Sequence, residues 1–261
     1  MSFSPPAVLA FAASDPTSGA GMQADILAIA GMGAHPLTAL TALTVQDTHG
    51  VQRLQAVEAA LVAEQARCVL ADIPAAAFKL GVLGSAANAR AVAAVLAEHP
   101  GVPVVLDPVL ASARGDTLAG AETVAVLRDL LLPLTTVATP NSIEARRLAP
   151  QSSSLAQCAQ AVVARGCRYV LVTGTHEASE EVVNTLYDAR GEVRADRWPR
   201  LPGSYHGSGC TLASAIAAAL ALGMTVSEAV RKAQEFTWQS LAAGYRPGGG
   251  QHVPNRIPAR A

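Results

Sequence analysis

The sequence is poor in aromatic side chains, in net charge and in long apolar runs, and each shortage excludes a class of protein. Aromatic residues make up 4% of the 261 residues, so Ala, Leu and Val have to fill the core. The formal net charge is -1, which argues against nucleic acid as the main partner, because such partners usually require a basic face. No apolar stretch reaches the roughly 20 residues needed to span a bilayer, so we expect no membrane partner.

A targeting segment and a metal-binding cysteine motif are also missing. Residues 7–13 are apolar, but no basic segment precedes them and Asp15-Pro16 follows them, which does not fit a signal peptide. The four cysteines lack the spacing of metal ligands. We therefore expect a cytoplasmic protein whose thiols are free.

Short apolar runs alternate with longer helical runs along the chain. Hydrophobic residues make up 51% of the sequence, which is enough for a substantial core. The pattern predicts strands at 7–13, 37–45, 76–83, 102–106, 136–138 and 169–173, with a hairpin at 182–188 and 192–196. It predicts helices at 21–33, 60–71, 86–99, 121–132, 155–166, 211–222 and 226–243. Continuous apolar strands separated by helices indicate an α/β fold with a mainly parallel sheet covered on both faces. Without a repeat or a linker, we expect a single domain over 1–261.

Polar side chains gather where the predicted strands end. They are Ser14 and Asp15, Gln46 and Asp47, Asp107, Thr139 and Asn141, and the run 173–175. In a parallel sheet, ligands bind beyond the carboxyl ends of the strands. We therefore expect these residues to line one cleft.

The start of the helix predicted at 211–222 is the most informative stretch. It reads His206-Gly207-Ser208-Gly209-Cys210-Thr211. The first turn of a helix leaves about four N–H groups without intrahelical partners, and with the helix dipole these favour an anion such as a phosphate. The functional interpretation is an anion hole for a transferring phosphoryl group, formed by the amides of Gly207 to Cys210. The alternative is an ordinary glycine-containing helix start.

Two side chains beside this anion hole carry further expectations. Cys210 lies in the first turn, where a thiol is more readily ionised. His206 contacts a phosphate or a ring, or simply caps the loop. The chain contains no GxxxxGK[ST] motif, so a phosphotransferase here is not a P-loop enzyme.

For several other candidate residues, both a functional and a structural role fit the sequence. Asp107 either holds Mg²⁺, usually through water, or forms an Asp-Pro turn. Asn141 and Glu144 form a capping box, with or without positioning magnesium or phosphate. Asp25 is a hydrogen-bond acceptor for substrate or an exposed helix carboxylate. The amide of Gln46 donates and accepts, which suits a heteroaromatic ring.

Together these motifs resemble the hydroxymethylpyrimidine/phosphomethylpyrimidine kinases of thiamine biosynthesis, in the ribokinase-like superfamily. The resemblance covers nearly the whole chain. It depends on the segments 13–25 (ASDPTSGAGMQAD), 41–50 (TALTVQDTHG), 106–109 (LDPV), 139–141 with Glu144, and 206–211. Most ribokinase-like sugar kinases carry aspartate at the position of Cys210, whereas cysteine is typical of the pyrimidine kinases and some similar pyridoxal kinases.

The resemblance implies a three-layer α/β/α sandwich, a homodimer, and the use of ATP and Mg²⁺. ATP would phosphorylate 4-amino-5-hydroxymethyl-2-methylpyrimidine and then its monophosphate, with Cys210 as a base or a polar neighbour of the substrate hydroxyl. The implied pyrimidine surface is Ala13, Asp25, Gln46, Val82 and Val109. The implied magnesium and phosphate region is Asp107 and Glu144, with Asn141, Thr173 and His206 on the nucleotide side. The tail 247–256 lies where the family closes its nucleotide pocket.

The sequence departs from the family pattern at two positions. Many members carry glycine where Ala13 stands and lysine where Thr173 stands. Without that lysine, the phosphate charge is left to magnesium, the anion hole and an arginine such as Arg114. Two other functions remain open: a pyridoxal kinase, with the same chemistry on another hydroxymethyl ring, and a non-catalytic pyrimidine-binding protein.

Overall fold

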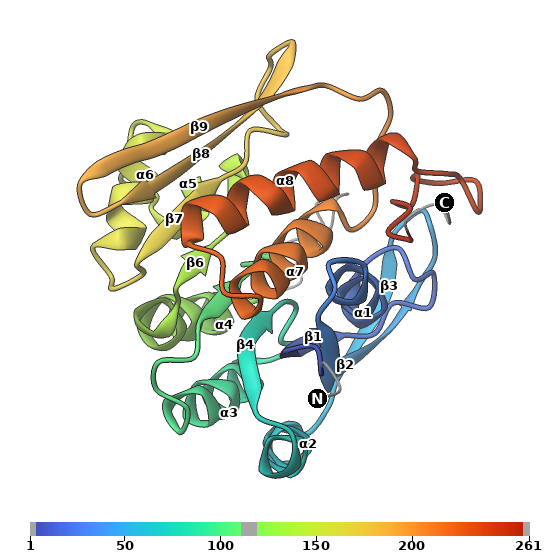
Figure 1. The fold of residues 1–261 in the computed structure, drawn as a ribbon, viewed down its shortest axis with the longest axis vertical. Coiled ribbons are helices and arrows are strands. Elements are labelled where there is room, and N and C mark those ends of the chain that lie inside the picture. The colour runs from blue at the N-terminus through green and yellow to red at the C-terminus, as the bar shows by residue number, and fades with distance from the viewer. Residues whose placement is uncertain (1–3, 111–118, 258–261) are drawn as a thin grey trace.

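The structure, a computed structural model, describes residues 4–110 and 119–257, so Arg114 lies outside the described residues. Nine strands form one sheet in the order β3-β2-β1-β4-β5-β6-β7-β8-β9, seen across the centre of Figure 1. The strands are β1 (Ala7–Ala13), β2 (His35–Gln46), β3 (Val51–Ala56), β4 (Ala75–Leu80), β5 (Val104–Leu106), β6 (Val137–Ala138), β7 (Tyr169–Val172), β8 (Glu181–Asp188) and β9 (Gly191–Pro199).

The six strands from β2 to β7 in this order run parallel, and antiparallel strands lie at both edges. β3 pairs antiparallel with β2, and the hairpin β8–β9 pairs antiparallel with β7. Every residue of β1 and β5 is buried, as expected for strands that helices cover on both faces. The carboxyl ends of the parallel strands therefore meet at one edge.

Two helical layers cover the sheet and complete the three-layer sandwich (Figure 1). One layer packs its apolar side chains with the core cluster on one face: α2 (Ala59–Asp72), α3 (Ala86–Ala97), α4 (Ala121–Val126), α5 (Ser142–Leu148) and α6 (Leu155–Val163). The other face is covered by α1 (Gly21–Gly31), α7 (Ser208–Ala221) and α8 (Val226–Ala242). None of the described helices is long and apolar enough to cross a membrane.

Helix α7 lies at the centre of the second layer. Ten of its residues are buried, from Cys210 to Ala219 without interruption, because small side chains let it pack closely against the sheet, α1 and α8. A helix that is apolar on all sides is a core helix. This burial fixes where the first turn of α7 lies relative to the strand ends.

The architecture confirms the predicted α/β sandwich, with three local differences. β3 was not predicted. The helix predicted at 121–132 is α-helical only to Val126, continues as a π-helical segment (Leu127–Leu131) and ends in a 3-10 turn (Leu132–Leu134) that contains Pro133. Proline cannot continue an α-helix. The strand predicted at 76–83 ends at Leu80, so Val82 follows the strand.

Candidate functional site

The first turn of α7 presents unpaired backbone donors. The amides of Ser208, Gly209 and Cys210 donate to no acceptor among the described residues, whereas the Thr211 amide donates to the Gly207 carbonyl at 3.0 Å. Gly207 is the N-cap residue and makes no side-chain cap. The structure thus has the set of donors that the sequence predicted, at the end of a helix whose dipole favours an anion.

Gly207 has a conformation and a neighbour that require glycine. Its φ is 79°, in the left-handed region that L side chains resist. A Cβ at this position would overlap the carbonyl oxygen of Gly19. The turn 15–20 therefore packs directly on the start of α7. The turn 15–20 and the first turn of α7 lie side by side at the edge of the sheet where the parallel strands end.

Asp107 lies beside the unpaired amides, directly after β5. A Cβ built at Gly209 would lie 3.6 Å from each carboxylate oxygen of Asp107. The Asp107 side chain is buried, and its Oδ2 has no hydrogen-bond partner within residues 4–110 and 119–257. Burial raises the pKa of Asp107 above its usual range, the charge of Asp25 adds to the effect, and Lys79 opposes it. A buried carboxylate oxygen without a partner is costly, so it marks a place for a ligand.

Cys210 also faces this position, but its thiol is not readily ionised. Burial raises its pKa to about 12, and the charge of Lys79 offsets only part of that effect. The expectation of an easily ionised thiol at the helix start is therefore wrong. Burial of the thiol disfavours its charged form.

Glu144 and Asn141 form the predicted capping box at the start of α5. The Asn141 side chain accepts from the amides of Ile143 and Glu144, and the Glu144 carboxylate accepts from the Asn141 amide at 3.0 Å. Burial and the charge of Asp107 raise the pKa of Glu144. The carboxylates of Asp107 and Glu144 are therefore close enough to repel each other. Such closeness is expected of two carboxylates that bind the same cation.

Thr173 lies next to Asn141, at the ends of the neighbouring strands β6 and β7. The two residues form an isolated parallel bridge, and the Thr173 amide donates to the Pro140 carbonyl at 3.0 Å. Both side chains are partly exposed. The structure brings together these two residues, which were predicted to lie on the nucleotide side.

The floor of the site is a buried ion pair that the sequence analysis missed. The Lys79 ammonium, from β4, lies 2.8 Å from both carboxylate oxygens of Asp25, and both side chains are 0% exposed. Ser214 Oγ of α7 donates to the same carboxylate at 2.8 Å. Because Asp25 has no exposed surface and both oxygens are engaged, we revise its expected role from substrate contact to support of the strands and α7. A single lysine within an apolar strand was the available signal, since a buried charge needs a partner.

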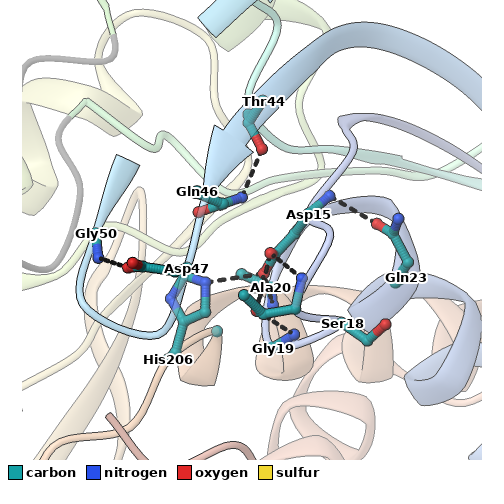
Figure 2. Close-up of polar contacts among 12 residues, drawn as sticks. Asp15, Ser18, Gly19, Ala20, Gln23, Thr44, Gln46, Asp47, Gly50 and His206 are labelled. Atoms are coloured by element: carbon teal, nitrogen blue, oxygen red, sulfur yellow. Dashed lines mark hydrogen bonds and ion pairs between the residues drawn. The ribbon is translucent and has the colours of Figure 1, made fainter. Parts of the chain in front are cut away.

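His206 pairs with Asp15, as Figure 2 shows. Its Nε2 lies 2.8 Å from Asp15 Oδ2, and Asp15 also accepts from Thr17 and from the Ala20 amide. Burial alone would raise the pKa of Asp15, but the hydrogen bond and charge of His206 lower it below its usual value. His206 thus ties the turn 15–20 to the loop before α7.

The residues predicted for the pyrimidine surface follow four adjacent parallel strands. Ala13 ends β1 and Gln46 ends β2, whereas Val82 and Val109 follow β4 and β5. The Gln46 amide nitrogen donates to Thr44 Oγ1 at 2.8 Å (Figure 2), and its Oε1 has no donor among the described residues. The exposed edge thus presents two valines and one free amide oxygen.

Arg256 ends the tail 247–256, which the resemblance placed at the nucleotide pocket, but its buried contacts were not predicted. Its side chain is buried and donates to backbone carbonyls of both turns that meet at Gly207. Sequence offered no signal for these contacts, because they join Arg256 to Gly207, 49 positions away, and to Gly19, 237 positions away.

A family model for phosphomethylpyrimidine kinase matches residues 15–255. The chain belongs to the phosphomethylpyrimidine kinase family. Within this family, it is 41% identical over 251 residues to a hydroxymethylpyrimidine/phosphomethylpyrimidine kinase of Streptomyces coelicolor, which covers 94% of this chain and 92% of that protein.

Solved structures agree with this membership. The structure of phosphomethylpyrimidine kinase from Clostridium difficile matches with a TM-score of 0.79 at 29% identity, over 90% of this chain and 99% of that one. An ADP complex of Bacillus subtilis pyridoxal kinase matches with a TM-score of 0.85 at 28% identity, over 97% and 98%. The family resemblance expected from the motifs is confirmed.

Proposed function

We propose that this protein transfers the terminal phosphoryl group of ATP to 4-amino-5-hydroxymethyl-2-methylpyrimidine, and then to the resulting monophosphate, in thiamine biosynthesis. Family membership supports the reaction class. The observation that carries the proposal is the group of unpaired amides at Ser208, Gly209 and Cys210 beside the unpaired Oδ2 of Asp107. Phosphoryl transfer depends mainly on positioning and on charge neutralisation, and this group offers both.

The pyrimidine would lie over the ends of β1, β2, β4 and β5. Val82 and Val109 would contact the ring faces, with Ala13 below. The free Oε1 of Gln46 accepts a hydrogen bond from the exocyclic amino group. This orientation would turn the hydroxymethyl group toward Asp107 and the start of α7.

The phosphates of ATP would lie on the amides of Gly207 to Cys210, with Asn141 and Thr173 on the nucleotide side and His206 at the rim. These donors neutralise the charge that develops on the equatorial oxygens. Removing one donor of this kind costs roughly 100- to 1,000-fold in rate.

Asp107 and Glu144 fit a magnesium ion. Two carboxylates plus phosphate oxygens and water are a usual donor set for Mg²⁺, and the described residues contain no cluster of three or more acidic, His or Cys side chains that would form a complete protein cage. A bound cation would relieve the repulsion between the two carboxylates and satisfy Asp107 Oδ2. When bound, magnesium neutralises phosphate charge.

Cys210 would hold the substrate hydroxyl as a neutral hydrogen-bonding group. A thiol whose pKa is raised to about 12 is not a base at neutral pH. Its neighbour Asp107 ionises at a lower pH than the thiol, so a carboxylate and not a thiolate lies beside the substrate hydroxyl at neutral pH.

Three parallel ADP-release assays test the proposal, with the hydroxymethylpyrimidine, its monophosphate and pyridoxal as acceptors. We expect turnover with the first two. The likeness to the Bacillus subtilis pyridoxal kinase makes pyridoxal the second candidate, and turnover with pyridoxal alone would establish that function instead. ADP release that is independent of every acceptor would contradict both, and a pyrimidine-binding protein without catalysis would release none.

We further propose a homodimer in the cytoplasm. The edge hairpin β2–β3 supports a second copy as partner, because Leu43 and Val45 are exposed side by side on it. A reaction that consumes ATP suits the cytoplasm.

A further inference from the structure

Arg256 is a large, buried side chain that forms no ion pair with any described residue, although the carboxylates of Asp25 and Asp15 favour its charged form from a longer distance. It is 2% exposed, although it stands only a few residues after the exposed glycine-rich tail segment. No ion pair within the described part of the chain involves it. A buried guanidinium keeps its charge, and a buried charge without a counter-ion is costly. The position therefore requires a reason beyond packing.

The hydrogen-bond partners of Arg256 among the described residues are all neutral, and they belong to the turn 15–20 and to the first turn of α7, which carries the anion hole. Nε donates to Thr211 Oγ1 at 2.8 Å, and Nη1 donates to the Ser18 carbonyl at 3.3 Å. Nη2 donates to the carbonyls of Gly19 and Gly207. One side chain thus fastens the turn 15–20 to the first turn of α7, on the side away from the free amides.

The contact with Gly207 reaches the anion hole through a peptide group. The Gly207 carbonyl and the Ser208 N–H are two ends of the same peptide. The carbonyl also accepts from Thr211 Oγ1 at 2.7 Å, and that hydroxyl in turn accepts from Arg256. Hydrogen bonds in such a chain polarise one another, so the guanidinium makes the Ser208 N–H a stronger donor to an anion.

The tail that carries Arg256 is fixed along its length. Tyr245 and Val253 exchange two backbone hydrogen bonds, the Gln251 amide donates to the Thr48 carbonyl, and the Asn255 amide donates to the Ser240 carbonyl. The His206 amide donates to the His252 carbonyl at 2.8 Å. The guanidinium is therefore held in place before any ligand arrives, which is the condition for preorganised charge stabilisation.

We propose that Arg256 is a positioning residue of the phosphoryl-transfer site: it holds the Gly207 turn in place and supplies, through the Gly207–Ser208 peptide, positive charge for a bound phosphate chain. The inference rests on the proposed function for the identity of the anion. It predicts an effect on nucleotide that is larger than any effect on the pyrimidine.

The test compares Arg256→Gln, which removes the charge, with Arg256→Lys, which keeps it. ADP binding is measured by calorimetry in the presence of magnesium, and KM is measured separately for ATP and for the pyrimidine. We expect Arg256→Gln to weaken ADP binding by at least about tenfold, equivalent to about 1.4 kcal/mol, with the pyrimidine KM changed by no more than about twofold. Arg256→Lys should recover part of the loss. The matched control is Arg246→Gln, which removes an exposed guanidinium from the same tail and should change neither value.

Each remaining outcome decides the proposal. Unchanged ADP affinity in a folded Arg256→Gln protein overturns it, and so does an equal change in both KM values, which a merely structural role would cause. If Arg256→Gln does not fold, Thr211→Val decides, because it removes the hydroxyl between Arg256 and Gly207: weaker ADP binding with an unchanged pyrimidine KM supports the proposal, and no change overturns it. A wild-type protein that binds ADP but phosphorylates none of the alcohols refutes the proposed function alone.

Discussion

At the scale of single residues, Lys79 forms an ion pair with Asp25 in which both side chains are fully buried. It is buried with Asp25, so Lys79→Met leaves a carboxylate in the core without its cation. Breaking a buried pair in this way costs about 3–5 kcal/mol, and we expect that loss in the free energy of unfolding measured with urea. The double variant Lys79→Met/Asp25→Asn should regain much of it, since no charge is left unpaired.

The exposed pair Arg67–Glu98 provides the control for Lys79. Its side chains are 49% and 45% exposed, so Arg67→Met should cost less than about 1 kcal/mol. Equal losses in Arg67→Met and Lys79→Met would contradict the role given to burial.

Cys210 gives the second prediction at this scale. If the thiol acts as a neutral hydrogen-bonding group, Cys210→Ser should keep more turnover than Cys210→Ala, which we expect to lose about 100-fold or more. The pH profile of kcat should show no ionisation that Cys210→Ser removes. Cys68→Ser, at an exposed position away from the site, is the control and should behave as the wild type. A profile that loses an ionisation between neutral pH and pH 9 in Cys210→Ser would show that the thiolate is the base.

At the scale of elements, the start of α7 depends on one glycine. Gly207→Ala adds a Cβ that overlaps the Gly19 carbonyl and must also adopt a positive φ. The control is Gly223→Ala at the end of α7, which has a φ of 86° but nothing within 4 Å of the added Cβ. Gly223→Ala should cost about 1–2 kcal/mol, the usual price of a left-handed residue, and keep its turnover. Gly207→Ala should lose more stability, measured by thermal unfolding, and nearly all turnover, measured by ADP release. Similar behaviour of the two variants would contradict the packing of the turn 15–20 on the first turn of α7.

The carboxylates at the ends of β5 and the start of α5 predict a pH dependence. Asp107 and Glu144 have pKa values raised by burial, so they add stability while protonated and this contribution is lost as pH rises through the folded-state pKa. Relative to the wild type, Asp107→Asn should therefore gain stability from about pH 4, where unfolded carboxyls ionise, up to about pH 6, the folded-state pKa of Asp107. Urea midpoints across that range measure the difference.

The exposed residue Asp129 should change stability with pH in the opposite direction to Asp107. Its hydrogen bond with Arg128 lowers its pKa, so its contribution is present above the pKa of the unfolded chain and is lost as pH falls. Relative to the wild type, Asp129→Asn should therefore become slightly less stable as the pH rises. A parallel trend in both variants would show that burial of Asp107 does not govern its ionisation.

At the scale of the whole molecule, the sequence predicted what periodicity controls and missed what long-range contacts control. The apolar strands and the buried helix α7 followed from the pattern of apolar runs along the chain. β3 was not predicted because half of its residues are polar and half are exposed, although the alternation in its last four residues, RLQA, was a usable signal. The anion-hole amides followed from local spacing, whereas the pairing of Lys79 with Asp25 and of Arg256 with two distant turns required the folded chain.

The assembly of two copies is the remaining whole-molecule prediction. Leu43 and Val45 are 53% and 45% exposed on β2, and alternation along the strand turns them away from Thr44 and Gln46. A contiguous exposed apolar patch beside a sheet edge is typical of an interface. Leu43→Glu/Val45→Glu should therefore convert a dimer into a folded monomer in sedimentation experiments. The control is Leu130→Glu, at a 43% exposed apolar residue in the π-helical segment after α4, which should leave the mass of the dimer unchanged. A monomeric wild type, or a dimer that survives the double variant, would refute this interface.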